Sequence, residues 1–179
     1  MDYLLLNELA EKLEIAPLNL LREEAEILVL TNLAESSLAG KIIFYGCTAL
    51  RLAYNCPRYS EDLDFLMVSQ ISENELSDVL QKTVAAAPEL SIGEVKDKRN
   101  TLFALLKLKS QFLKHPLSIK LEIAKRKNGI EKEFRPLSSP CSPLQPVLYT
   151  ATLASLEKMK LFALKAREAP RDWFDAYYI

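Results

Sequence analysis

The chain has 179 residues and a formal net charge of −1, and 49% of its residues are hydrophobic while 26% are charged. This length suits one sizeable domain, and the composition excludes an intrinsically disordered chain. The near-neutral charge excludes a general nucleic-acid binder, so a nucleic-acid contact would need a local basic patch. Two basic runs are candidates, although solvated loop charge is the more ordinary explanation of each: Lys96, Lys98 and Arg99, and Lys125, Arg126 and Lys127.

Cysteine usage and hydropathy indicate a protein of the reduced cytoplasm without a membrane span. The three cysteines, Cys47, Cys56 and Cys141, are odd in number and none are spaced as CxxC, so neither a disulfide framework nor a zinc site is expected. The N-terminus lacks the pattern of a signal peptide. The most apolar stretch, residues 27–33, is far too short to cross a bilayer.

Hydrophobic periodicity, turn residues and capping signals divide the chain into helices and strands. Pro17 suits the first turn of a helix, and Ser72 with Glu75 predicts a capping box at the start of another. The predicted order is helix 3–15, helix 17–37, strand 41–45, helix 48–54, strand 62–68, helix 72–86, strands 90–95, 101–109 and 117–125, and helices 153–167 and 171–178. This order predicts an α/β (α+β) fold, in which helices flank a mixed β-sheet and a short helical segment ends the chain.

Two connections complete this outline. The strands 101–109 and 117–125 flank a turn at His115 and Pro116, which predicts a hairpin or a meander. Residues 136–146 hold four prolines and three serines, which predict a linker or an extended crossing loop. We therefore expect a core with N-terminal helices over residues 1–136, and a linker with C-terminal helices that pack on this core over residues 137–179.

Asp62 and Asp64 are candidate metal ligands. One residue separates them, so on a strand both side chains point to the same face. Two carboxylates this close repel each other unless a cation neutralises them, and oxygen ligands favour Mg2+ or Mn2+. The alternative is a solvent-facing strand that happens to carry two acids. A calcium-binding loop is excluded because the fifth and sixth loop positions, Leu66 and Met67, are apolar.

Glu122 is a candidate for a third ligand. It lies on the less apolar face of its predicted strand, and a neighbouring position in the sheet would bring it beside Asp62 and Asp64. Three carboxylates around two metal ions are the donor set of a two-metal site for in-line phosphoryl chemistry. The alternative is that Glu122 pairs with Lys120 or Lys107 on the sheet surface, and the spacing leaves both alternatives open.

A glycine turn between a strand and a helix, Gly46-Cys47-Thr48, is a candidate phosphate site, because backbone amides at a helix start bind anions. The Thr48 hydroxyl suits either a phosphate oxygen or a helix cap. Arg51 and Arg58 suit phosphate contacts or neutralisation of the acids, and an ordinary surface ion pair is the alternative for each.

Together these segments resemble the AbiEii/AbiGii-type nucleotidyltransferases, which are toxin components of bacterial toxin–antitoxin and phage-defence systems in the DNA polymerase β-like superfamily. The likeness rests on GCTALR at residues 46–51, RYSEDLDF at 58–65, KLEI at 120–123, EKMKLFAL at 157–164 and RDWFD at 171–175. It spans roughly residues 42–178. Cys47 departs from the family pattern, which has a second glycine at this position, or serine in related enzymes.

The resemblance implies a nucleotidyltransferase fold and the transfer of a nucleoside monophosphate from an NTP to an acceptor. It implies that Asp62, Asp64 and Glu122 bind Mg2+ or Mn2+, and that Lys160 joins them in catalysis. It implies nucleotide contacts from Gly46, Cys47, Thr48, Arg51, Ser60, Lys160 and Asp172. The implied acceptor is tRNA or another RNA, and the implied protein partner is a cognate antitoxin.

Alternatives accompany this interpretation. A non-catalytic or truncated nucleotide-binding module would keep the same fold and act through a partner protein. Lys160 has an alternative of its own: together with Lys158 and Lys165 it could be a solvated charge on an amphipathic helix. Three aromatic residues near the C-terminus are expected to pack in the core rather than to stack on bases: Trp173, Phe174 and Tyr177.

Overall fold

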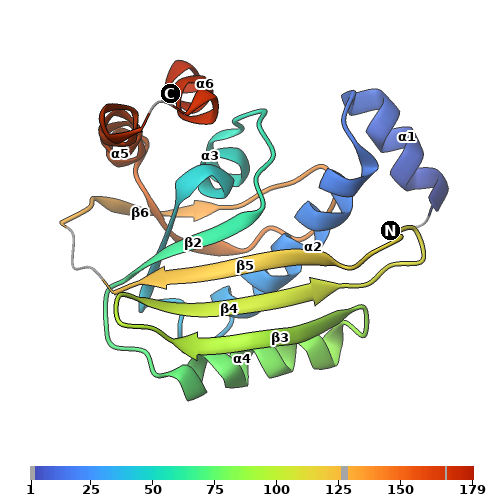
Figure 1. The fold of residues 1–179 in the computed structure, drawn as a ribbon, viewed down its shortest axis with the longest axis horizontal. Coiled ribbons are helices and arrows are strands. Elements are labelled where there is room, and N and C mark those ends of the chain that lie inside the picture. Colours follow the sequence, from blue (N-terminus) through green and yellow to red (C-terminus); the bar gives the residue numbers. More distant parts are fainter. Residues whose placement is uncertain (1–2, 126–128, 168) are drawn as a thin grey trace.

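The computed structural model describes residues 3–125, 129–167 and 169–179. Within these residues the chain forms six helices and seven strands (Figure 1). The helices are α1 (Tyr3–Leu13), α2 (Pro17–Ala34), α3 (Gly46–Tyr54), α4 (Glu73–Ala86), α5 (Leu153–Ala166) and α6 (Pro170–Tyr178). The strands are β1 (Ile42–Tyr45), β2 (Asp62–Met67), β3 (Leu90–Asp97), β4 (Thr101–Leu108), β5 (Leu117–Ala124), β6 (Lys132–Pro136) and β7 (Val147–Ala151). No helix in this described part has the length and apolar character needed to cross a bilayer.

All of these strands belong to one mixed sheet with the order β3-β4-β5-β2-β1-β7-β6. β3, β4 and β5 form an antiparallel meander, whereas β5 pairs with β2, and β7 with β1, in parallel. The sequence did not indicate β6 and β7, because Pro136 ends one and Pro146 directly precedes the other. Residues 137–146, expected to be a linker or crossing loop, connect this antiparallel pair. Residues 137–179, expected to hold a linker and helices, therefore also contribute the strand β7 to the sheet.

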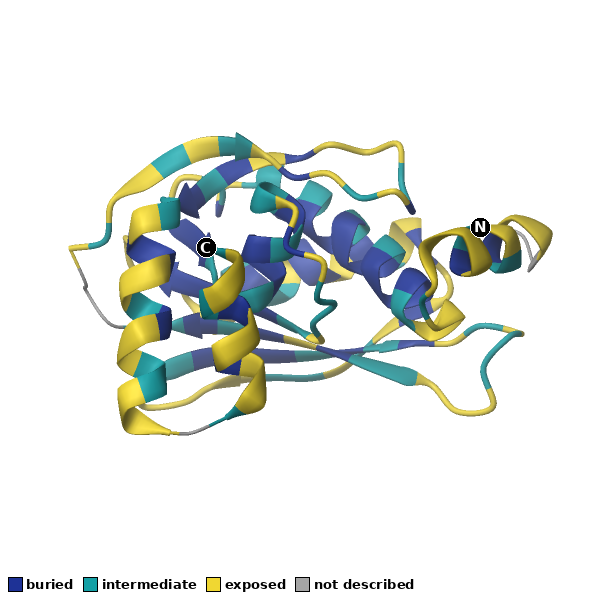
Figure 2. Cartoon of the chain, turned by 90° about the horizontal axis from the view of Figure 1, so that it is seen from above, coloured by how far each residue is buried: buried dark blue, intermediate teal, exposed yellow. Residues whose placement is uncertain are grey.

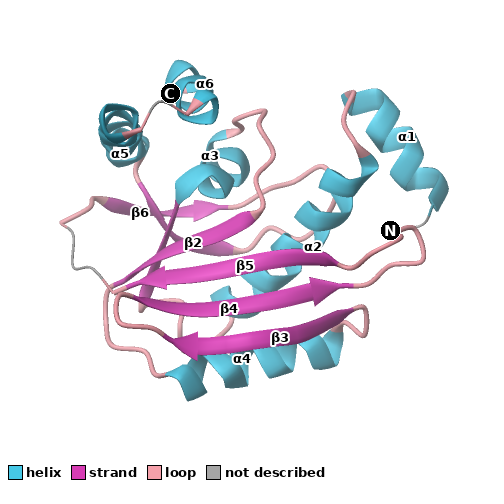
Figure 3. Cartoon of the chain, in the orientation of Figure 1, coloured by secondary structure: helices cyan, strands magenta, loops and turns pink. Residues whose placement is uncertain are grey.

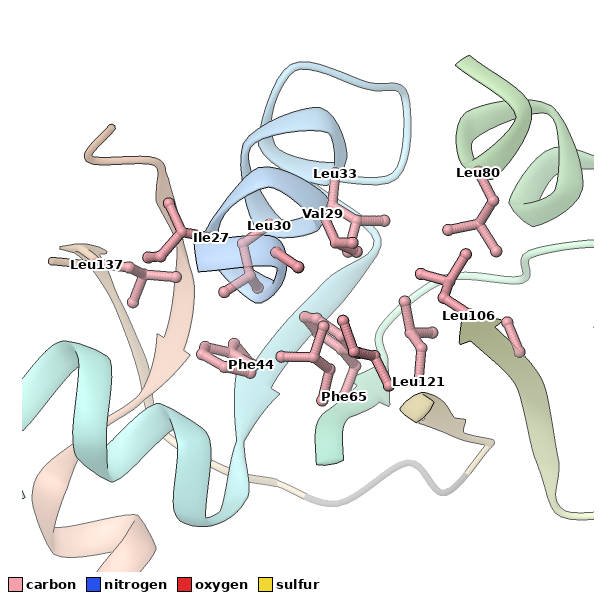
Figure 4. Packing of buried hydrophobic residues seen from close by; sticks show 14 of the residues in the cluster. Ile27, Val29, Leu30, Leu33, Phe44, Phe65, Leu80, Leu106, Leu121 and Leu137 are labelled. Carbon is pink, nitrogen blue, oxygen red and sulfur yellow. The ribbon is translucent and has the colours of Figure 1, made fainter. Parts of the chain in front are cut away.

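The main hydrophobic core lies between the sheet and the helices α2 and α4 (Figure 4). Phe44 of β1 and Phe65 of β2 are fully buried in it, with ring centroids 5.1 Å apart. Leu30 of α2 and Leu121 of β5 belong to the same cluster. Because side chains alternate along a strand, the neighbours of Phe65 and Leu121 project from the opposite face of the sheet.

That opposite face carries α3, with α5 beside α3 and α6 beside α5 (Figures 1 and 3). A second cluster forms there, in which Leu50 of α3 and Leu156 of α5 pack with Ile43 and Leu66 of the sheet. Most residues of the two C-terminal helices are exposed (Figure 2). The buried side chains of α6 are two aspartates, Asp172 and Asp175, so charged groups rather than apolar ones face inward from this helix.

We expect Phe65→Ala to lower the free energy of unfolding by about 3–5 kcal/mol, because it leaves a cavity against Phe44. Phe162→Ala is the control: Phe162 is 74% exposed on α5, and its loss should change stability by less than about 0.5 kcal/mol. Urea denaturation measures both. Equal effects of the two substitutions would contradict a core beneath α2 and α4.

Candidate active site

Two neighbouring parallel strands bring three carboxylates together. Asp64 of β2 is the register partner of Glu122 on β5, and Asp62 is the partner of Lys120. Leu63 is fully buried on the opposite face, as strand alternation requires. The sequence predicted a shared face for the two aspartates and a neighbouring strand for Glu122, and the structure has this arrangement.

The negative charge of these carboxylates is only partly compensated. Burial, followed by the nearby charges of Asp62 and Glu122, raises the pKa of Asp64 to about 6. Asp62 Oδ1 is covered from solvent and accepts no hydrogen bond from the described residues, although Lys120 Nζ lies 3.3 Å away as an ion-pair partner. The ion pair is at the sheet surface and is weakened by water, so it balances the charge incompletely.

The lysines that offered an alternative role for Glu122 have other partners. Lys120 pairs with Asp62, and Lys107 Nζ donates to the Ser118 hydroxyl at 3.1 Å. Among the described residues, no three His, Cys, Asp or Glu side chains are gathered into a formed metal site. The Asp62 oxygen that accepts no hydrogen bond and the raised pKa of Asp64 are nevertheless features that a hard divalent cation would relieve, so these oxygen donors fit such an ion chemically.

Gly46 lies directly against Asp64 at the start of α3. Its φ of +85° belongs to the left-handed region, and a Cβ at this position would lie 2.7 Å from Asp64 Oδ2. Both the backbone angle and the close approach therefore require glycine. The N-terminus of α3 consequently faces the carboxylates, and helix N-termini favour anions such as phosphate.

Thr48 differs from its predicted role. Its hydroxyl donates to the main-chain carbonyl of Asp62 at 2.6 Å, and the residue is 1% exposed. The hydroxyl therefore does not cap α3; it fixes the backbone of β2 beneath the carboxylates. Ser60, another predicted nucleotide contact, lies half-buried in the segment before β2.

The structure does not bring Arg51 into the carboxylate group. Its guanidinium bonds Glu23 of α2, with Nε 2.8 Å from Oε2, and donates to the Tyr59 hydroxyl at 2.6 Å. Glu23 also accepts from Ser139 at 2.6 Å. A buried carboxylate is stable only with a cation beside it, so the ion pair with Glu23 holds the Arg51 side chain between α2 and α3.

Lys160 of α5 reaches the glycine turn. Its Nζ lies 2.9 Å from Cys47 Sγ, 2.7 Å from Asp175 Oδ2 and 3.5 Å from Asp172 Oδ1. Burial lowers the pKa of this amine, but the contacts with Cys47 and Asp175 outweigh burial, so its pKa lies above the ordinary value. A solvated helix charge is therefore the wrong description of Lys160, whereas Lys158 is exposed as expected.

Two further charged residues, Arg58 and Asp175, belong to the group of side chains around Lys160. The sequence did not predict the contacts of either residue. Asp175 of α6 accepts from both Nε and Nη2 of Arg58, each at 2.7 Å. Burial raises the pKa of Asp175, but Arg58 and Lys160 lower it more, to about 2. The RDWFD motif could have indicated this role of Asp175, because residues three apart lie on the same face of a helix. In the structure Asp172 and Asp175 are both buried.

Comparison with known families decides the relationship. The family described as nucleotidyl transferase AbiEii toxin, of type IV toxin–antitoxin systems, matches residues 28–179. The chain belongs to the AbiEii family. The family predicted from the motifs is thereby confirmed. A comparison with curated proteins gives no match.

Solved structures share the fold of this AbiEii-family chain. JHP933 from Helicobacter pylori is 23% identical with a TM-score of 0.66, over 91% of this chain and 66% of that one. MenT4, a nucleotidyltransferase toxin from Mycobacterium tuberculosis, is 21% identical with a TM-score of 0.63, over 84% of this chain and 55% of that one. The predicted nucleotidyltransferase fold with its mixed sheet is confirmed, and the chain spans about two thirds or less of the length of these two proteins.

Other expectations for this AbiEii-family chain were wrong or fall on residues without a description. Three aromatic residues expected in the core are exposed, at 61%, 40% and 86%: Trp173, Phe174 and Tyr177. Of the two basic runs, Lys125 pairs with Asp97, and Lys98 lies 3.7 Å from the ring centroid of Phe103. Arg126 and Lys127 lie outside the described residues.

We expect Gly46→Ala to lower the free energy of unfolding by about 1–2 kcal/mol and to displace the Asp64 carboxylate, because the new methyl group meets both a left-handed backbone and Asp64 Oδ2. Gly40→Ala is the matched control, since nothing lies within 4 Å of its Cβ position. It should change stability by less than about 1 kcal/mol. Thermal denaturation compares the two, and an unchanged Gly46→Ala protein would contradict the close approach.

Proposed function

We propose that this chain transfers a nucleoside monophosphate from an NTP to an acceptor hydroxyl and releases pyrophosphate. One observation carries the proposal: carboxylates on β2 and β5, the start of α3, and Lys160 from α5 converge although they are distant in sequence. The carboxylates are suited to bind a cation, and the helix N-terminus and the amine beside them are suited to bind a triphosphate. Membership of the AbiEii family supports the same reaction class.

In this proposal Asp62 and Asp64 hold Mg2+ or Mn2+, and Glu122 completes the site and accepts the proton of the acceptor hydroxyl. When bound, the cation supplies charge neutralisation for the triphosphate and the leaving pyrophosphate. The amides at the start of α3 bind phosphate oxygens beside Gly46, and Lys160 steadies the triphosphate. Preorganised charge of this kind contributes most of the catalysis in phosphoryl transfer.

Membership of the AbiEii family supports a proposal for the biological setting. We propose a toxin of a type IV toxin–antitoxin system, with a role in phage defence, that works in the cytoplasm beside a cognate antitoxin. The favoured acceptor is tRNA or another RNA. We also propose a core over residues 1–136 and a second part over residues 137–179 that packs on it. This second part joins the sheet through β7 and the group at Cys47 through Lys160 and Asp172.

We expect Asp62→Asn combined with Asp64→Asn to reduce nucleotide transfer by roughly 100-fold or more, because the charges that hold the cation are lost. The matched control combines Glu11→Gln with Asp78→Asn, which removes two exposed acids from α1 and α4 and should leave transfer unchanged. The measurement is label incorporation from labelled NTPs into total cellular RNA or protein, with Mg2+ and with a chelator. Undiminished transfer by the double aspartate variant would overturn the metal assignment.

Calorimetry separates the enzyme from the alternative of a non-catalytic module. The enzyme should bind at least one NTP in the presence of Mg2+ and label an acceptor pool. Binding of NTP without label in any pool would favour a nucleotide-binding module that acts through a partner. Absence of Mg2+-dependent NTP binding would contradict the proposed function altogether.

A further inference from the structure

Asp175 is a buried carboxylate to which the proposed reaction assigns no role. It is fully buried, and its partners come from three separate segments: Arg58 before β2, Cys47 at the start of α3, and Lys160 on α5. Arg58 binds it through both Nε and Nη2, the fork-like geometry that fixes a guanidinium in one orientation. The hydrogen bond to Asp175 raises the pKa of Arg58, so this arginine stays charged.

The charges around Asp175 exceed what a simple helix anchor requires. One carboxylate needs one cation, and Arg58 alone supplies two hydrogen bonds to it. Asp175 nevertheless also binds Lys160 at 2.7 Å. With the neighbouring pair of Arg167 and Asp172, the group holds three cations and two carboxylates. Within these five groups the cations outnumber the carboxylates by one, and Lys160 also acts on the charge of Asp64. The group lies beside the N-terminus of α3, which itself favours an anion.

The contact between Lys160 and Cys47 indicates where the Lys160 ammonium could bind an anion. An ammonium group has three donors. The three nearest acceptors of Lys160 are Asp175, Asp172 and the Cys47 sulfur. Sulfur is the weakest acceptor of the three, and Cys47 directly follows Gly46 at the start of the helix. A phosphate oxygen at this helix start would be a better third acceptor for the amine than sulfur, and both hydrogen bonds from Arg58 to Asp175 would remain.

We propose that Asp175 is a positioning residue that holds Lys160 and Arg58 side by side as a two-cation clamp for the triphosphate at the start of α3. This inference rests on the proposed function. Without the carboxylate, the two cations repel each other and lose the acceptor that holds both of them in position. A residue that only anchors α6 would behave differently, since its loss would weaken folding, binding and transfer together.

The test is Asp175→Asn in the full chain, with two measurements on nucleotide. Removal of a negative charge leaves the site more positive, so the Kd for NTP with Mg2+ should stay within about threefold of the wild-type value or decrease. The rate of nucleotide transfer should fall at least about tenfold, because Lys160 is no longer held in place. Asp175→Glu, which keeps the charge, should recover part of the rate.

A third measurement needs no nucleotide. In the wild-type protein Lys160 should react slowly with an amine-specific acylating reagent, because it is buried and ion-paired. In Asp175→Asn its labelling, followed by mass spectrometry, should accelerate at least about tenfold. Lys158 and Lys165 on the same helix are internal controls, since both are exposed and should label equally in the two proteins.

Two outcomes overturn the inference: a parallel loss of NTP affinity and transfer rate in Asp175→Asn, or a variant that matches the wild type in transfer and in Lys160 labelling. If Asp175→Asn fails to fold, Arg58→Lys replaces the forked pair by a single contact and should give the same separation of affinity from rate. Failure of the proposed function would look different, because the wild-type protein itself would then show no Mg2+-dependent NTP binding or no transfer of label to any acceptor.

Discussion

The Gly46 backbone passes so close to the Asp64 carboxylate that no side chain fits between them. This contact couples the start of α3 to β2, and the Thr48 hydroxyl on the Asp62 carbonyl adds a second tie between the same two elements. The helix N-terminus and the carboxylates therefore keep a fixed spacing. Glu122 is placed relative to them by strand register, and Lys160 by its contact with Cys47.

The site has an anionic half on the sheet and a cationic half on the helices. The carboxylates of β2 and β5 project from a rigid surface, because hydrogen bonding to neighbouring strands fixes their backbone. The cations come from side chains that are long and flexible in isolation, and buried aspartates restrict them. Buried ion pairs contribute little net stability compared with apolar packing, but a broken one is costly, so they specify a geometry. The ion pairs of Asp172 and Asp175 fix the position of α6 in this way.

Sequence reasoning reached those features of the site that depend on local rules. Alternation along a strand placed Asp62 and Asp64 on one face, and the motif resemblance located Lys160. Partners that meet across the fold were beyond it: nothing in the spacing of Arg58 and Asp175, 117 positions apart, indicates that they touch. Arg51 was misplaced for the same reason, since its partner Glu23 lies on a helix that carries no recognised motif. The aromatic residues of α6 were misjudged because two buried aspartates, not apolar side chains, decide which side of this helix faces inward.

The distance in sequence between Cys47 and its partners bears on how the protein is made. Lys160 lies 113 positions after Cys47, and Asp175 lies 128 positions after it. Chains grow at roughly 5–20 residues per second, so on the order of ten seconds separates synthesis of the carboxylate strand β2 from synthesis of Lys160. β7 is made late as well, although it pairs beside β1 within the sheet. A ribosome-bound chain therefore carries the carboxylates of β2 before Lys160, and the group at Cys47 stays incomplete until α5 and α6 have been made.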